Sequence, residues 1–296
     1  MVNALSVDVE DYFHVSCLEK QIGKGDWPSF PSRIGRNVDR VLELLNKTRV
    51  RATFFVLGWV ADHHPSVVRE IAQAGHELGC HSYWHRLVYE MTAEEFVQDT
   101  LQAKAAIEDA SGMEVTGYRA PSYSITRESE WALDILLELG FRYDSSIFPI
   151  EHDRYGWLGT SRFATAILQS GNKTLWEFPP STYPLFGRAV PIAGGGYLRI
   201  LPYNYMKWAL EYVNLEEQRE GCVYFHPWEI DSEQPRLLDS TVAWWRHSVG
   251  ISGMETKLAR LLEDFKFAPL GEVLRTVSCE SGGNQGNRSG KCIIQT

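Results

Sequence analysis

The stretch ALSVDVED at residues 4–11 sets the pattern on which the fold depends. Its first six residues are mostly apolar and lie between polar ones, which predicts a buried strand over residues 4–9. Apolar residues then recur at helical spacing over residues 36–45, which predicts a helix after the strand. A strand followed by a helix is the unit that the chain repeats.

Further strand and helix patterns alternate toward the C-terminus. We expect strands over residues 52–57, 76–80, 115–118 and 223–226, and helices over residues 65–74, 92–110, 126–139 and 255–265. Residues 151–202 are rich in glycine, proline and aromatic residues, which predicts long loops and irregular strands. The alternation predicts an α/β fold with a parallel sheet, open or closed into a barrel, whose functional residues follow the carboxyl ends of the strands.

The chain shows no internal repeat and no linker before its last residues, so we expect one domain over residues 1–277. Residues 278–296 are rich in glycine, serine and asparagine, and we expect them to form a disordered tail. The five cysteines are odd in number and lack C-x-x-C spacing, which disfavours a disulfide framework and a cysteine-type zinc site.

The composition limits the classes of binding partner and the cellular location that we expect. The 296 residues carry a formal net charge of −9, which argues against a nucleic-acid partner because phosphate binding needs clustered lysine and arginine. Ten tryptophans, 13 tyrosines and 13 phenylalanines suit a saccharide, although most aromatic side chains belong to protein cores. Residues 1–10 show no secretory signal, and no apolar run is long enough to span a membrane. We therefore expect a cytoplasmic protein, free or at the inner face of the membrane.

Acidic side chains end the first predicted strand. Asp8 and Glu10 project to the same face of a strand, whereas Asp11 lies opposite unless the chain has already turned. Carboxylates at the end of a buried strand are costly unless they are paired, hydrated or bound to a cation. A polar strand exit is the competing interpretation and carries equal weight for this motif alone.

Two histidines follow the strand predicted at residues 76–80. His81 and His85 stand four residues apart, a spacing that lets two imidazoles of one helical turn bind a single metal ion. Each histidine alone is better explained as structural. Two histidines and one carboxylate, however, form a catalytic ligand set that leaves a position open for water, and zinc is the metal that we expect.

Two further polar residues lie near predicted strand ends. His226 opens the motif HPWE and could act as a general acid, since an ordinary imidazole pKa of about 6.5 allows proton transfer near neutral pH. A hydrogen-bonded loop histidine is the simpler interpretation of this motif alone.

Arg119 cannot lose its proton, so a buried position would let it hold a carboxylate such as Asp8. A surface arginine before a turn is equally compatible with the sequence.

In order and spacing, five motifs resemble the series found in NodB-homology polysaccharide deacetylases, carbohydrate esterase family 4. They are D-V-E-D at 8–11, H-S-x-x-H at 81–85, R-x-P at 119–121, Y-D-S-S at 143–146 and H-P-W-E at 226–229. The resemblance covers about residues 5–228 and implies a distorted (β/α)7 barrel. The segment from 229 to about 277 resembles a C-terminal extension found in deacetylases of bacterial exopolysaccharide loci.

The resemblance also implies roles for individual residues. Asp8 matches the catalytic base of the family, and Arg119 matches the residue that orients this base. His81 and His85 match the two metal-binding histidines, and His226 matches the general acid.

The first motif departs from the common family pattern, because two adjacent aspartates are replaced by D-x-E-D. The third metal ligand is therefore open: Glu10 is favoured by a related D-x-D subgroup and by its strand face, and Asp11 is the rival. Asp144 corresponds loosely to a family residue that supports the acid. A backbone N–H near Ser122 would hold the oxyanion of the tetrahedral intermediate.

These features predict a metal-dependent hydrolase that removes N-acetyl groups from an amino-sugar polysaccharide or its lipid-linked precursor. An allantoinase-like C–N hydrolase is one rival, although that branch lacks the metal histidines. A carbohydrate-binding protein on a retired catalytic scaffold is another, and the presence of base, ligands and acid together argues against it. The sequence predicts neither the exact sugar nor the oligomeric state.

Overall fold

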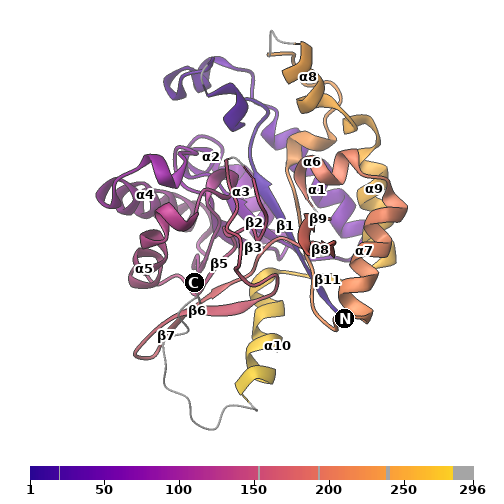
Figure 1. Cartoon of the computed structure of the whole chain (residues 1–296). Helices are drawn as coiled ribbons and strands as arrows, with labels where there is room; N and C mark the ends of the chain where they lie inside the picture. The colour runs from indigo at the N-terminus through magenta and orange to yellow at the C-terminus, as the bar shows by residue number, and fades with distance from the viewer. Residues whose placement is uncertain (20, 153, 193, 238–240, 283–296) are drawn as a thin grey trace.

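The computed structural model describes residues 1–19, 21–152, 154–192, 194–237 and 241–282. Its centre is a sheet with the strand order β10-β1-β2-β3-β4-β5-β7-β6, and β11 lies beside β1 (Figure 1). The seven strands from β10 to β7 pair in parallel, and β6 joins the edge antiparallel to β7. Helices α9, α1, α3, α4 and α5 follow one another around the outside of this curved sheet, each in contact with the next (Figure 1).

The strands are β1 (Asn3–Val9), β2 (Thr53–Val56), β3 (Glu77–Cys80), β4 (Gly117–Tyr118), β5 (Tyr143–Asp144), β6 (Thr165–Ser170), β7 (Lys173–Glu177), β8 (Thr182–Leu185), β9 (Arg188–Pro191), β10 (Cys222–Phe225) and β11 (Phe267–Ala268). The α-helices are α1 (Ile34–Thr48), α2 (Gly58–His63), α3 (Pro65–Gln73), α4 (Ala93–Ser111), α5 (Trp131–Glu138), α6 (Gly195–Ile200), α7 (Tyr203–Leu215), α8 (Thr241–Ser248), α9 (Ile251–Asp264) and α10 (Leu270–Gly282). Six short 3-10 helices are η1 (Ser16–Leu18), η2 (Lys24–Ser29), η3 (Val88–Glu90), η4 (Pro121–Tyr123), η5 (Arg127–Ser129) and η6 (Pro227–Ile230).

Local sequence signals account for these elements. Every residue of β1 is buried, as expected of a strand in a parallel sheet that is covered on both faces. Helix α4 begins with a reciprocal capping box between Thr92 and Glu95 and ends at Gly112, whose φ of 70° places it in the left-handed region. The predicted alternation of strands and helices is confirmed.

The two ends of the parallel array approach each other without regular pairing. The backbone N–H of Ser181, beyond β7, donates to the carbonyl of Cys222 in β10 at 3.0 Å. The N–H of Cys222 donates in return to the Ser181 hydroxyl at 2.6 Å. This irregular closure of seven parallel strands agrees with the distorted (β/α)7 barrel expected above.

One local prediction was confirmed in part and another was wrong. Residues 151–202 contain irregular strands, as expected, which form the hairpin β6–β7, with a shift in its register, and the hairpin β8–β9, but they also contain the helix α6. The glycines at the hairpin tips, Gly171 and Gly187, take positive φ. Helix α10 runs to Gly282, since buried Leu274 and Val277 anchor it, so residues 278–282 are helical and not disordered. The rest of the predicted tail, 283–296, lies outside the described residues.

Helix α10 marks the amino end of the barrel. Its backbone N–H groups at Leu270 and Gly271 donate to Thr53 and Glu77, the first residues of β2 and β3. The polar motifs predicted from the sequence follow the opposite, carboxyl ends of β1, β3, β4 and β10. Within the described part of the chain, none of the helices combines the length and the hydropathy needed to cross a membrane.

Candidate metal centre and active site

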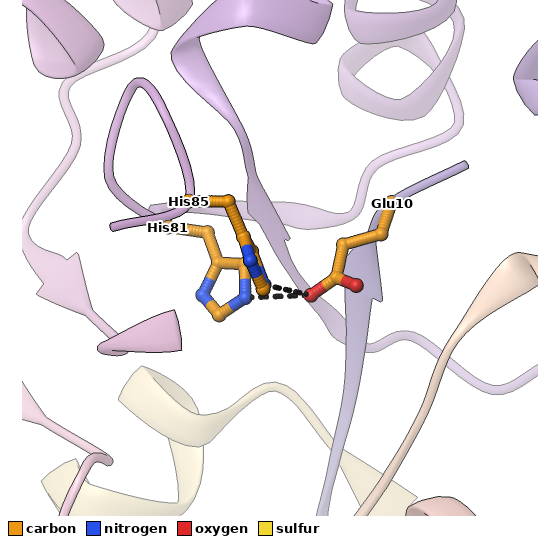
Figure 2. A group of neighbouring side chains, drawn as sticks. All are labelled: Glu10, His81 and His85. Carbon is orange, nitrogen blue, oxygen red and sulfur yellow. Dashed lines mark hydrogen bonds and ion pairs between the residues drawn. The ribbon is translucent and has the colours of Figure 1, made fainter. Parts of the chain in front are cut away.

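Three side chains from two strand ends converge on one point (Figure 2). Oε1 of Glu10, after β1, lies 3.0 Å from Nε2 of His81 and 2.9 Å from Nε2 of His85, both after β3. All three residues are at most 4% exposed, and one ligand atom from each lies within 4.8 Å of the others. Two imidazoles and one carboxylate in this arrangement form a candidate site for a divalent cation.

The hydrogen bonds of His81 show that these residues fit a metal ion. Its Nδ1 lies 2.8 Å from the backbone carbonyl of Arg119, and a carbonyl only accepts, so Nδ1 carries the proton. In the neutral ring the lone pair of Nε2 therefore faces the carboxylate of Glu10. Two electron-rich atoms at 3.0 Å need a proton or a cation between them, and an imidazole anchored through its other nitrogen is the usual form of a metal ligand.

The loop that carries both histidines is strained and firmly held. Ser82 and His85 have φ values of 65° and 52°, which non-glycine residues adopt only when the surroundings impose them. Asp99 of α4 supplies that constraint, because its carboxylate accepts from the Ser82 hydroxyl at 2.6 Å and from the backbone N–H groups of Tyr83 and Trp84 at 2.8 and 3.2 Å. Asp99 thus fixes the direction in which the imidazoles point.

Asp11, the rival ligand, has a structural position. Its carboxylate accepts from the backbone N–H groups of Tyr12, Arg33 and Ile34 and from the hydroxyl of Ser32. These bonds tie the end of β1 to the start of α1. Because its oxygens are occupied in this way, Asp11 is not a member of the metal cluster, and Glu10 is the carboxylate that the structure brings to the two histidines.

Asp8 and Arg119 form a buried ion pair beside the cluster. Nη1 of Arg119 lies 2.7 Å from Oδ1 of Asp8, and Arg119 is 0% exposed. The guanidinium also donates to the hydroxyls of Ser6 and Ser145 and lies 4.3 Å from the centre of the Phe55 ring. With its donors engaged, Arg119 fixes the orientation of the Asp8 carboxylate, as predicted for a buried position of this arginine.

His226 faces the same point from the end of β10. Its Nε2 lies 3.8 Å from Oδ2 of Asp8 and 3.9 Å from Oε1 of Glu10. Its Nδ1 lies 3.0 Å from Oε2 of Glu229, and Oε1 of Glu229 receives a hydrogen bond of 2.7 Å from Nε of Arg199. One edge of the imidazole is therefore anchored, and the other is directed at the carboxylates of the site.

The surrounding charges determine the protonation of the His226 imidazole. Burial disfavours the charged imidazole, but the carboxylates of Glu10, Glu229 and Asp8 outweigh it and raise the pKa of His226 to about 9. Burial also raises the pKa of Glu10, but the imidazoles of His85, His226 and His81 hold it well below its usual range. The geometry thus presents the protonated imidazole of His226 and the ionised carboxylate of Glu10 to one small space.

Asp144 does not have the role that the resemblance implied. It pairs across the sheet with Glu177 of β7 and accepts a hydrogen bond from Ser146, whereas the carboxylate that supports His226 is Glu229. Burial raises the pKa of Asp144 to about 6 and that of Glu177 well above its usual range. The oxygens Oδ2 of Asp144 and Oε2 of Glu177 have no donor among the described residues, so one proton shared between them is the natural arrangement.

Sequence reasoning missed Glu229, Arg199 and Asp99 as parts of the site. Glu229 stands three residues after His226 in the HPWE motif, and this spacing was a usable signal for a supporting carboxylate. Arg199 and Asp99 lie in helices far from the motifs, and no local pattern distinguishes them from surface charges. Their role depends on tertiary contacts alone.

Comparison with known proteins divides the chain into two matched regions. Residues 27–143 match the family described as polysaccharide deacetylase, and residues 145–275 match a domain of unknown function, DUF3473. His81, His85 and Arg119 lie in the first region and His226 in the second. Asp8 and Glu10 precede both, so the site is assembled from three parts of the chain.

Proteins of similar sequence agree with the match of residues 27–143 to the polysaccharide deacetylase family. A peptidoglycan deacetylase of Helicobacter pylori is 32% identical over 126 residues, which are 43% of this chain and 41% of that protein. The peptidoglycan-N-acetylglucosamine deacetylase PgdA of Listeria monocytogenes is 31% identical over 88 residues, 30% of this chain and 19% of that protein. The matched regions thus span less than half of each of these relatives.

Solved structures share the fold at low identity. A Mycobacterium smegmatis structure described as a polysaccharide deacetylase covers 98% of this chain and 93% of its own, with a TM-score of 0.62 and 21% identity. The structure of Puue allantoinase also has a TM-score of 0.62, with 15% identity, and covers 94% of this chain and 91% of its own. Residues 27–143 thus match the polysaccharide deacetylase family and residues 145–275 match DUF3473, and the fold of nearly the whole chain is shared with these solved structures.

Proposed function

We propose that this protein hydrolyses the N-acetyl group of an amino sugar in a polysaccharide or in its lipid-linked precursor and releases acetate. The observation that carries the proposal is the convergence of Glu10, His81 and His85 beside a carboxylate and an anchored imidazole. The two named deacetylases among the relatives act on peptidoglycan, which supports an N-acetylated saccharide as the substrate class.

Glu10, His81 and His85 would hold a divalent cation, for which zinc is the first candidate because two imidazoles and one carboxylate suit it and leave a position open. When bound, such an ion acts as a Lewis acid that polarises a carbonyl and lowers the pKa of water. The burial of the three ligands restricts the site to small groups, as an acetamide is.

The other residues move the protons. Asp8 takes a proton from the attacking water as the new C–O bond forms, and Arg119 keeps its carboxylate oriented. The backbone N–H near Ser122 stabilises the developing oxyanion. His226 then donates the proton on Nε2 to the leaving nitrogen as the C–N bond breaks, so that acetate and a free amine result.

We also propose that the two matched regions act as one catalytic domain over residues 1–277. The DUF3473 region contributes β7 and β10 to the barrel sheet, and it carries His226 together with Glu229 and Arg199. A deacetylase domain without this region would lack its acid. The cytoplasmic location expected from the sequence stays a prediction.

Acetate release tests the proposal. The purified chain is incubated with N-acetylglucosamine oligomers and with undecaprenyl-linked N-acetylated saccharides, before chelation, after chelation, and after zinc is added back. We expect release that disappears with the chelator and returns with zinc. Saccharide binding without release from any acetylated sugar would favour a carbohydrate-binding protein, and turnover of allantoin alone would favour the allantoinase-like alternative.

A further inference from the structure

We propose that His14 donates a hydrogen bond from Nε2 to one hydroxyl of the bound saccharide, in a small side pocket that adjoins His85. The inference rests on the proposed function, because it assumes that a saccharide reaches the metal centre. It adds a substrate contact from the loop after β1, outside the five motifs.

The ring of His14 is fixed on one edge and packed among three aromatic rings. Its Nδ1 accepts a hydrogen bond of 2.9 Å from the backbone N–H of Asp11. The ring centre lies 4.4 Å from Phe13, 4.5 Å from Trp27 and 5.1 Å from Trp59. His14 is 3% exposed, so its orientation is set by packing and by the Asp11 bond together.

This orientation decides what Nε2 can do. Because Nδ1 accepts from a backbone N–H, the proton of the neutral ring is on Nε2. Burial, the largest influence, holds the pKa of His14 well below its usual range, so the ring is neutral. A protonated Nε2 has no lone pair for a metal ion, and His14 is therefore a donor and not a fourth ligand.

The donor at Nε2 of His14 is buried and has no hydrogen-bond partner in the described part of the chain. A buried donor without an acceptor destabilises the folded protein, and such groups are rare enough to need a specific reason. An acceptor supplied by a bound substrate removes this cost only in the complex.

The pocket beside His14 has the size and lining for one substituent of a sugar. His14 and His85 line it together with apolar side chains such as Phe13 and Trp27 and with the charged Glu19 and Lys24. Its volume of about 10 Å³ holds one water-sized group, so it accepts a hydroxyl and not a whole ring. The apolar part of the lining suits the carbon that carries the hydroxyl. The hydroxyl of Ser16, which also lines the pocket, lies 2.7 Å from that of Ser122 and links the pocket to the R-x-P loop.

Two substitutions distinguish the donor at Nε2 of His14 from the structural hydrogen bond that its Nδ1 accepts from the Asp11 N–H. His14→Asn keeps an acceptor at the position of Nδ1, which can still receive the Asp11 N–H, but removes the donor at Nε2. His14→Gln places an amide N–H the same number of bonds from Cβ as Nε2. The probe is the N-acetylglucosamine tetramer, and its Kd is measured by calorimetry in an Asp8→Asn background so that binding is read without turnover.

We expect His14→Asn to weaken binding about tenfold, the loss of roughly 1.4 kcal/mol for one hydrogen bond, and His14→Gln to recover most of it, with unchanged zinc content in both. An unchanged Kd in His14→Asn overturns the inference. Should this variant not fold, singly deoxygenated tetramers are titrated into the parent: one analogue is expected to bind about tenfold more weakly, and equal binding of all overturns it. Acetate release by the wild-type chain reports separately on the proposed function.

Discussion

Nη1 of Arg119 lies 2.7 Å from Oδ1 of Asp8 in a position without solvent contact. A buried ion pair contributes little net stability, because desolvation of both charges offsets their attraction. Its place at the carboxyl end of the barrel, with Oδ2 of Asp8 3.8 Å from Nε2 of His226, is therefore the basis on which we propose a role in chemistry. The arginine holds one oxygen of Asp8 and leaves the other for a reacting group.

Replacement of the base is the first prediction. Asp8→Asn keeps a hydrogen-bond acceptor for Arg119 but cannot take a proton, so we expect kcat for acetate release to fall about 10²–10⁴-fold while bound zinc is retained. Steady-state kinetics and metal analysis of the same preparation measure both effects. Asp39→Asn, on an exposed position of α1, is the control, and activity of Asp8→Asn within tenfold of the control rules out Asp8 as the base.

The alkaline limb of the pH profile depends on Glu229. A general acid works only when protonated, so activity falls as the pH rises through the pKa of His226, which the neighbouring carboxylates raise. Glu229→Gln removes one of these charges, and we expect the fall in kcat to begin at a lower pH than in the wild type. A bound cation shifts the alkaline limb of the pH profile to lower pH in both proteins, so the quantity to compare is the difference in pH between their two limbs.

The matched control for this comparison is Glu233→Gln, because Glu233 lies four residues further on and is exposed, with Arg36 as its partner. Its alkaline limb is expected to match that of the wild type. Coincident limbs for Glu229→Gln and wild type show that Glu229 does not govern the protonation of His226.

Asp99 is expected to affect metal affinity without touching the metal. Asp99→Asn weakens the bonds to Ser82 and to the backbone of residues 83–84 that hold the histidine loop, and the loss of such supporting contacts costs about 10–100-fold in affinity. Competition with a zinc-binding dye measures the Kd. Asp109→Asn, exposed on the same helix, is the control, and equal affinities of the two variants contradict the prediction.

The pair Asp144 and Glu177 predicts a pH effect on stability. Their folded pKa values are raised, so folding takes up a proton, and this contribution is fully present below the unfolded pKa values and is lost as the pH rises through the folded ones. Glu177→Gln removes the proton uptake. We expect the difference in Tm between Glu177→Gln and wild type to increase from pH 5 to pH 8, by about 2–4 °C for each kcal/mol of stability that the wild type loses. A difference in Tm that stays constant over this pH range argues against the shared proton.

The strand and helix order was predictable because parallel strands and their helices leave local periodic signals, as in β1 and α4. The two histidines were predictable for the same reason, since residues 81 and 85 stand close in sequence. Glu10 was favoured as the third ligand and is the carboxylate found beside the histidines, but Asp11 remained a rival because the chain turns at the end of β1, where the N–H of Glu10 donates to the carbonyl of Asp8 at 3.0 Å. Beyond this turn the strand-face rule no longer determines where Asp11 points.

The residues that hold His226, the proposed acid, illustrate the same limit of prediction from sequence. The contact between Arg199 and Glu229 spans 30 residues and joins α6 to η6, so it exists only after these two parts of the DUF3473 region have folded together. Asp144 was assigned from motif order, but its position in β5 places it opposite Glu177. Motif order identifies residue types, whereas the fold determines which carboxylate meets which imidazole.

Zinc binding by Glu10→Gln and Asp11→Asn tests the central claim most directly. The two residues are adjacent, but only Glu10 reaches both histidines, while Asp11 holds the start of α1. Calorimetric titration of the metal-free chains with zinc should give one high-affinity site in wild type and Asp11→Asn and none in Glu10→Gln or His85→Ala. Retention of that site in Glu10→Gln and His85→Ala would contradict the account.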